Sequence, residues 1–132
     1  MAAPADACCG GKKMLELPRW AVVGRGSNQF VVQLLARLKA LGKEVSHVDP
    51  SSGAEPGIPK ALADVKEPLD AVNLCANPKI GATVIDDMHK LGVKNVFVQP
   101  GAEAPELKER CEELGITWHE GCVLIESGAP GH

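Results

Sequence analysis

The residues best suited to chemistry are small ones, gathered where an apolar run gives way to an amphipathic segment. Glycine lets a backbone turn sharply and come close to a diphosphate, whose charge is then held by N–H groups at the start of the next helix. Two of the three glycines of a dinucleotide fingerprint are present, and Gln29 replaces the third. The loop therefore predicts a phosphate site, with a tight turn that needs small residues for packing as the alternative. Its residues are Gly24, Arg25, Gly26, Ser27 and Asn28.

Two later loops also carry candidate ligand-binding residues. Asp49 and Pro50 follow the second apolar run, where an acidic residue of a dinucleotide fold meets the ribose hydroxyls. An Asp-Pro pair is also an ordinary turn former, so this interpretation stays open beside the first. Gln99 and Gly101 follow the fourth run, where Gly101 permits a turn with positive φ. Gln99 is placed either to contact a substrate or to bridge two loops.

The loop between the third apolar run and the next helix combines Cys75, Ala76, Asn77 and Pro78. Asn77 suits the N-cap of a helix and Pro78 its first position, so helix initiation alone explains both residues. The same backbone could lie against the adenosine end of a ligand. We expect both roles together, because the cap also orients the loop.

Metal and nucleophile chemistry find less support. The five cysteines (8, 9, 75, 111 and 122) include no CxxC pair, so zinc ligands would have to come from separate elements. His119 and Cys122 are close in sequence, but that spacing does not ensure a nucleophile beside its base. We therefore expect no metal site and assign no catalytic residue.

The elements that position these loops alternate between strand and helix, which predicts a single-domain, Rossmann-like, doubly wound parallel sheet of about five strands. In such a sheet ligands bind beyond the carboxyl ends of the strands, where all these loops lie. Phe30, Leu34 and Leu38 form the expected apolar stripe of the first helix, joined by Val31, Leu35 and Leu41, with Ser27 or Asn28 as its cap. The predicted strands are 20–23, 44–48, 71–74, 93–98 and one from 116, and the predicted helices are 30–41, 60–65, 78–91 and 103–114.

The composition of the chain argues against some classes of binding partner. The net charge of -3 and the pI near 5.8 disfavour a nucleic-acid partner, which requires clustered Lys and Arg. The absence of a long apolar run or a signal-peptide core argues against a membrane, so we expect a soluble, cytoplasmic protein with reduced thiols. The folded domain is expected over residues 18–127, between a flexible tail at 1–17 and a C-terminal tail at 128–132.

The ordered set of motifs resembles the small stand-alone CoA-binding domain proteins and the N-terminal domain of the succinyl-CoA synthetase α subunit. The similarity covers residues 18–127 and is carried by the runs 22–24, 44–50, 68–72 and 92–101 and by Cys122 after the last strand. It implies CoA across the strand ends, with its phosphates at Gly24, Gly26 and Ser27. By the same resemblance 49–50 and 75–78 lie near the adenosine, and Gln99 and Gly101 face the pantetheine.

Departures from the family leave three functions open. The first loop is about two residues shorter than is common, Arg25 stands where a small residue is usual, and Asp49 replaces an asparagine. The ligase's phosphorylated-histidine domain has no counterpart in this chain. One hypothesis is a CoA or acyl-CoA carrier, sensor or scaffold without chemistry of its own. The others are a small NAD(P)-linked enzyme or redox sensor, which would suit Asp49, and a degenerate fold that serves protein contacts only.

Overall fold

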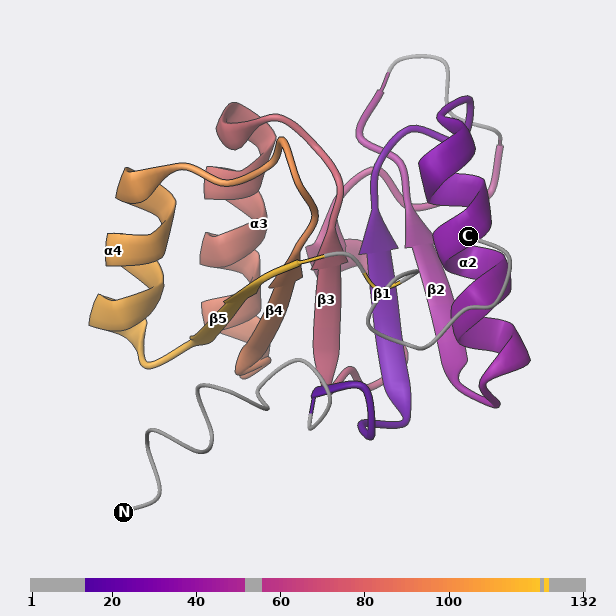
Figure 1. Ribbon diagram of the computed structural model, residues 1–132, viewed down its shortest axis with the longest axis horizontal. Helices are drawn as coiled ribbons and strands as arrows, with labels where there is room; N and C mark the ends of the chain where they lie inside the picture. Colours follow the sequence, from indigo (N-terminus) through magenta and orange to yellow (C-terminus); the bar gives the residue numbers. More distant parts are fainter. Residues whose placement is uncertain (1–13, 52–55, 122, 124–132) are drawn as a thin grey trace.

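The computed structural model describes residues 14–51, 56–121 and 123, and Figure 1 shows strands alternating with helices throughout them. Each strand run is followed by glycine, proline or polar residues that end it, as the sequence predicts. The elements are β1 (Arg19–Val23), α2 (Gln29–Ala40), β2 (Glu44–Val48), the 3-10 helix η1 (Leu62–Asp64), β3 (Ala71–Leu74), α3 (Pro78–Leu91), β4 (Asn95–Val98), α4 (Pro105–Leu114) and β5 (Thr117–Glu120).

The five strands form one sheet in the order β2-β1-β3-β4-β5, and every neighbouring pair is parallel. The chain winds outward from β1 to β2, then crosses back to the other side of β1 and continues from β3 to β5. This confirms the Rossmann-like, doubly wound fold. The reversal lies between β1 and β3, so these two strands mark the position where a ligand is expected.

One face of the sheet packs against α2. Trp20 and Val22 of β1 lie in this layer with Val31, Leu34 and Leu38 of the helix, all fully buried. The predicted stripe was wrong at its two ends, because Phe30 is 58% exposed and Leu41 is 40% exposed. Val31, another predicted member, faces the sheet and is fully buried. Met14, which we expected within the tail, is buried in the same layer.

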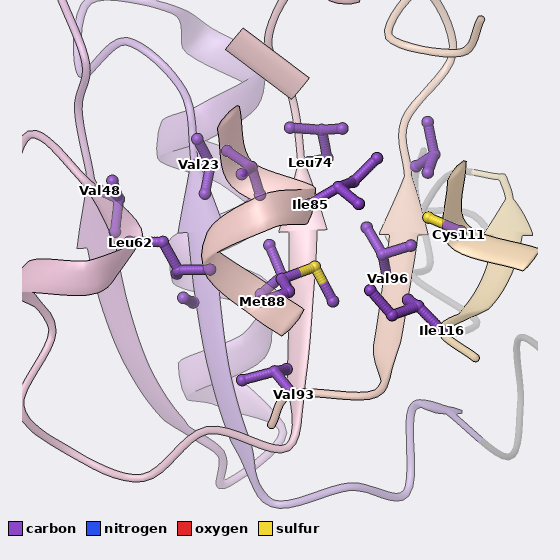
Figure 2. Packing of buried hydrophobic residues seen from close by; sticks show 14 of the residues in the cluster. Val23, Val48, Leu62, Leu74, Ile85, Met88, Val93, Val96, Cys111 and Ile116 are labelled. Atoms are coloured by element: carbon purple, nitrogen blue, oxygen red, sulfur yellow. The ribbon is translucent and has the colours of Figure 1, made fainter. Parts of the chain in front are cut away.

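The opposite face is covered by η1, α3 and α4. Alternate residues of the strands, Ala21 and Val23 in β1, point into this layer, where Ile85 and Met88 of α3 meet them (Figure 2). Because β1, β3 and β4 are buried on both faces, their sequences are apolar at nearly every position. No helix among the described residues is long and apolar enough to cross a membrane.

The ends of the helices follow the predicted signals. Gly92, which follows α3, has a φ of +75°, and Gly115, which follows α4, has a φ of +74°, so both adopt the left-handed conformation that ends a helix. The bounds of β2, β3 and α3 match the prediction. The fourth strand begins at Asn95 rather than Val93, and α4 begins at Pro105 rather than Glu103.

Candidate functional site

A cavity of about 550 Å³ opens at the carboxyl ends of the strands, where the winding reverses between β1 and β3. We call it the first cavity. Its volume lies in the ordinary range for small-molecule sites, about 300–1,000 Å³. Four of its lining residues, Ser51, Ile80, Pro100 and Ala102, were not predicted from the sequence. The predicted residues that line it are Gly24, Arg25, Asn28, Pro50, Cys75, Ala76, Asn77 and Gly101.

Gly24 brings the loop after β1 against the loop after β3. A Cβ atom at this position would lie 2.6 Å from the carbonyl oxygen of Cys75 and 2.6 Å from a methyl carbon of Val31. No side chain fits at that distance, so the close approach of the two loops depends on glycine. The N–H of Cys75 donates to the carbonyl of Val23 at 2.8 Å and fixes the same approach from the other side.

Asp49 and His47 hold the other side of the first loop. Asp49 is buried, and its carboxylate accepts from the N–H of Gly26 at 2.9 Å and from the N–H and hydroxyl of Ser51 at 2.9 and 2.6 Å. Burial by itself raises the pKa of Asp49, but the hydrogen bonds from Ser51 and Gly26 and the nearby His47 outweigh it and lower that pKa. His47 Nε2 donates to the carbonyl of Gly24 at 2.8 Å.

This arrangement changes the roles expected for Gly26 and Asp49. The N–H of Gly26 is used within the protein, and neither residue lines the first cavity. Asp49 therefore shapes the loop and does not present a free carboxylate to a ligand. The sequence could not show this, because the two residues are 23 positions apart and meet only through the pairing of β1 with β2.

Unpaired donors lie just before and at the start of α2, where Arg25 and Asn28 line the first cavity. The side chain of Asn28 caps the helix by accepting from the N–H of Phe30 at 2.8 Å, so Asn28 rather than Ser27 is the N-cap. Within the described part of the chain, the backbone N–H groups of Arg25, Ser27 and Gln29 have no acceptor. Arg25 adds a full positive charge, and its exposed side chain forms no ion pair with another described residue.

Helix α3 points its N-terminus at the same cavity. Asn77 caps it by accepting from the N–H of Ile80 at 3.0 Å, and Pro78 occupies the first turn, as predicted. Neither α2 nor α3 has an acidic residue in its first turn. The positive ends of both helix dipoles are therefore left for an anion in the first cavity.

The two candidate residues of the loop after β4, Gly101 and Gln99, have different surroundings in the structure. Gly101 lines the first cavity with a φ of +95°, and its N–H donates to the carboxylate of Glu103 at 2.9 Å. Gln99 is buried away from the cavity, and its side-chain oxygen accepts from the N–H of Val123 at 3.0 Å. The structure thus favours the bridging role for Gln99.

A second cavity of about 270 Å³, which the sequence did not predict, adjoins the first. Pro50 and Ile80 line both. Its other walls come from the ends of β1 and β2, from Lys60, Ala61 and Leu62 before and within η1, and from one side of α3. The sequence carries no local signal for this cavity, because the helix repeat does not show whether Asp86 or Asp87 faces it.

The fully buried cysteine of the described residues shows little reactivity in the structure. Cys111 is fully buried in α4, where burial and the charge of Glu112 raise its pKa to about 11. Its thiol is therefore protonated at neutral pH and unsuited to nucleophilic attack. In the described residues no group of three or more His, Cys, Asp or Glu side chains could hold a metal ion. Cys122 lies outside the described residues.

Comparisons with known proteins agree with this geometry. A family model described as "CoA binding domain" matches residues 18–128. No curated protein matches the chain. Among solved structures, a hypothetical protein from Pyrococcus horikoshii superimposes with a TM-score of 0.78 at 20% identity, over 89% of this chain and 87% of its own. A protein from Thermus thermophilus gives 0.76 at 23% identity, over 88% and 92%. A conserved hypothetical protein from Pyrococcus furiosus gives 0.71 at 26% identity, over 83% and 98%.

Proposed function

The chain belongs to the CoA binding domain family, and from this premise we propose that it binds CoA or an acyl-CoA across the strand ends. The diphosphate lies in the first cavity against the N–H groups of Arg25 and Ser27. The protein acts as a carrier, sensor or scaffold and performs no chemistry of its own on the ligand.

One observation carries the proposal: the unpaired N–H and the charged side chain of Arg25 lie at a cavity at the reversal of the sheet, together with two helix N-termini. Arg25 and Ser27 are exposed, so water accepts from their N–H groups in the free protein, and a diphosphate can replace that water with several acceptor oxygens at once. The carboxylate of Asp49, which contacts the loop, is held by three hydrogen-bond donors and lies outside the lining of the first cavity.

The hydrogen bonds that Asp49 already accepts also favour CoA over NAD(P) as the ligand. A dinucleotide site uses an acidic residue at this strand end to accept from the ribose hydroxyls. Here both carboxylate oxygens already accept from Gly26 and Ser51, so they offer little to a ribose. The replacement of asparagine by aspartate in the family's motif is thus compatible with CoA, because the added charge serves the loop.

Isothermal titration calorimetry with CoA, acetyl-CoA and NAD tests the proposal. We expect CoA to bind and NAD to bind at least about tenfold more weakly, a difference of ~1.4 kcal/mol. Arg25→Glu should weaken CoA binding by about tenfold or more, because it replaces a charge-assisted contact with a repulsive one. Tighter binding of NAD than of CoA, or binding of neither, would overturn the proposal.

The matched control is Lys94→Glu, which makes the same change of charge just before β4, at the opposite end of the sheet. It should leave the Kd for CoA within about twofold, since distant sites act independently. An equal loss of affinity in both variants would mean that overall charge, not Arg25, attracts the ligand.

A further inference from the structure

Ser51 is a polar residue of the first cavity that the sequence motifs do not mark, and Asp49 orients its hydroxyl group. Ser51 is half-buried and belongs to the lining of the cavity. Its hydroxyl and its N–H both contact the same carboxylate oxygen of Asp49, at 2.6 and 2.9 Å. The short distance between the two oxygen atoms is typical of a hydrogen bond to a charged acceptor.

The proton of this short hydrogen bond must come from Ser51. Burial raises the pKa of Asp49, but hydrogen bonds from Ser51 and Gly26 outweigh it and lower that pKa, so the carboxylate is ionised at neutral pH and can only accept. The hydroxyl proton of Ser51 is therefore directed at Asp49, and the oxygen keeps its lone pairs. No residue within 14–51, 56–121 or 123 donates to that oxygen. Ser51 thus offers the cavity an acceptor and no donor.

An acceptor at this position restricts which group of a ligand can lie beside it. A phosphate oxygen at neutral pH is itself an acceptor, so it could bind Ser51 only if the hydrogen bond to Asp49 broke. Arg25 lines the same cavity and has the opposite preference, because it carries a positive charge. The diphosphate therefore belongs beside Arg25, and a hydrogen-bond donor belongs beside Ser51. The hydrogen bond to the ionised carboxylate also makes the oxygen of Ser51 a stronger acceptor.

The donor must lie close to the diphosphate, because Ser51 is held beside the loop after β1. The carboxylate of Asp49 accepts from Ser51 and also from the N–H of Gly26, the neighbour of Arg25. CoA carries two free hydroxyl groups on either side of its diphosphate, the 2′-hydroxyl of the ribose and the hydroxyl of the pantoyl group. Each is a donor from which the lone pairs of Ser51 can accept.

We propose that Ser51 accepts a hydrogen bond from a hydroxyl group next to the diphosphate of the ligand, so that this residue determines specificity for a ligand with a hydroxyl at that place. The inference rests on the proposed function, because it takes the diphosphate beside Arg25 as the anchor. It adds a second contact of opposite polarity, which sets the direction in which the ligand lies in the first cavity.

Calorimetry on the full-length protein tests the assignment with CoA and the variants Ser51→Ala and Ser51→Cys. Alanine removes the oxygen, and cysteine keeps the shape of serine but replaces the oxygen with a weak acceptor. Both variants should bind CoA about fivefold more weakly than the wild type, the typical value of one hydrogen bond between neutral groups. Ser46→Ala is the matched control, because Ser46 lies in β2 and lines neither of the two cavities. Its Kd for CoA should stay within about twofold.

Two fragments of CoA distinguish the two hydroxyl groups. If the hydroxyl belongs to the ribose, the wild type should bind ADP about fivefold more tightly than 2′-deoxy-ADP, and Ser51→Ala should lose that preference. If it belongs to the pantoyl group, Ser51→Ala should weaken the binding of 4′-phosphopantetheine by the same factor and leave that of ADP unchanged. Either result supports the assignment of Ser51.

The outcomes separate this inference from the proposed function. Unchanged or tighter binding of CoA by folded Ser51→Ala and Ser51→Cys would overturn the role of Ser51 and leave the CoA site standing. An equal loss in Ser46→Ala would also overturn it. If the wild type does not bind CoA, the proposed function fails first. Far-ultraviolet circular dichroism checks the fold of each variant, which we expect to be kept because Asp49 still accepts from the N–H groups of Gly26 and residue 51.

Discussion

Both ends of the sheet hold a paired carboxylate, Asp70 at the amino end and Asp49 at the carboxyl end, but they differ in the donors beside it. At the amino end, Arg19 donates from its backbone and guanidinium to Asp70 at 3.0–3.1 Å, and Asn95 donates to the carbonyl of Asp70. At the carboxyl end, the N–H groups of Arg25 and Ser27 have no acceptor within the described chain. Groups paired within the protein stabilise it, whereas donors left unpaired around a cavity are available to a ligand. The difference therefore separates the end that holds the fold from the end at which we propose that the ligand binds.

The largest effect should come from Gly24→Ala, which affects both stability and binding. The new methyl group would lie 2.6 Å from a backbone oxygen that cannot move aside easily, so we expect a loss of about 3 kcal/mol or more in the free energy of unfolding. Urea denaturation measures it. Gly26→Ala is the control, because its nearest neighbour is His47 at 3.3 Å, and it should cost less than about 1 kcal/mol. Equal losses would show that the loops do not depend on the close approach at Gly24.

Asp70→Asn should distinguish most clearly between the role of the amino end in stability and the role of the carboxyl end in binding. It weakens the contacts with Arg19 at the amino end, so the variant should unfold at a lower urea concentration. Its Kd for CoA should stay within about twofold of the wild-type value, because the two ends are distant. Arg25→Glu should show the reverse pattern, with weakened binding and little change in the urea midpoint. A loss of CoA affinity in folded Asp70→Asn would contradict the division of roles.

Acid should destabilise both ends through two carboxylates. Hydrogen bonding and charge from Arg19 lower the pKa of Asp70, and hydrogen bonds from Ser51 and Gly26 outweigh burial to lower that of Asp49. A lowered folded pKa gives stability that is present above the unfolded pKa, about 3.9, and is lost as pH falls through the folded value. The free energy of unfolding should thus decrease below about pH 4. The double variant Asp49→Asn/Asp70→Asn should show a weaker decrease, and an unchanged pH profile would contradict the assignment.

The smallest effect that we expect is a gain in stability. Asn73 in the middle of β3 is fully buried, and neither polar atom of its side chain has a partner within the described structure. Asn73→Val removes that cost and suits a buried strand, so the free energy of unfolding should rise by about 1 kcal/mol. CoA affinity should not change. A fall in stability would show that the amide contributes an interaction in the folded protein.

The sequence predicted the first cavity better than the second for a physical reason. Gly24, Asn77 and Gly101 act through backbone geometry and helix capping, which are local and leave a readable pattern. Asp87 lines the second cavity, and the helix repeat alone does not say whether it or Asp86 faces inward. That depends on η1, which packs against α3 from an irregular connection without periodicity. The hydrogen bond from Gly26 to Asp49 was missed for a similar reason, since only the sheet brings the two loops together.

The most direct test of the central claim is a ¹⁵N–¹H correlation spectrum of the labelled protein during titration with CoA. If the diphosphate accepts from the free donors of the first loop, the amide resonances of Arg25, Ser27 and Gln29 should shift most, together with that of Lys79 in the first turn of α3. The amides of Arg19, Asp70 and Asn95 at the amino end should not move. Shifts confined to the amino end, or no shift at millimolar CoA, would contradict the account.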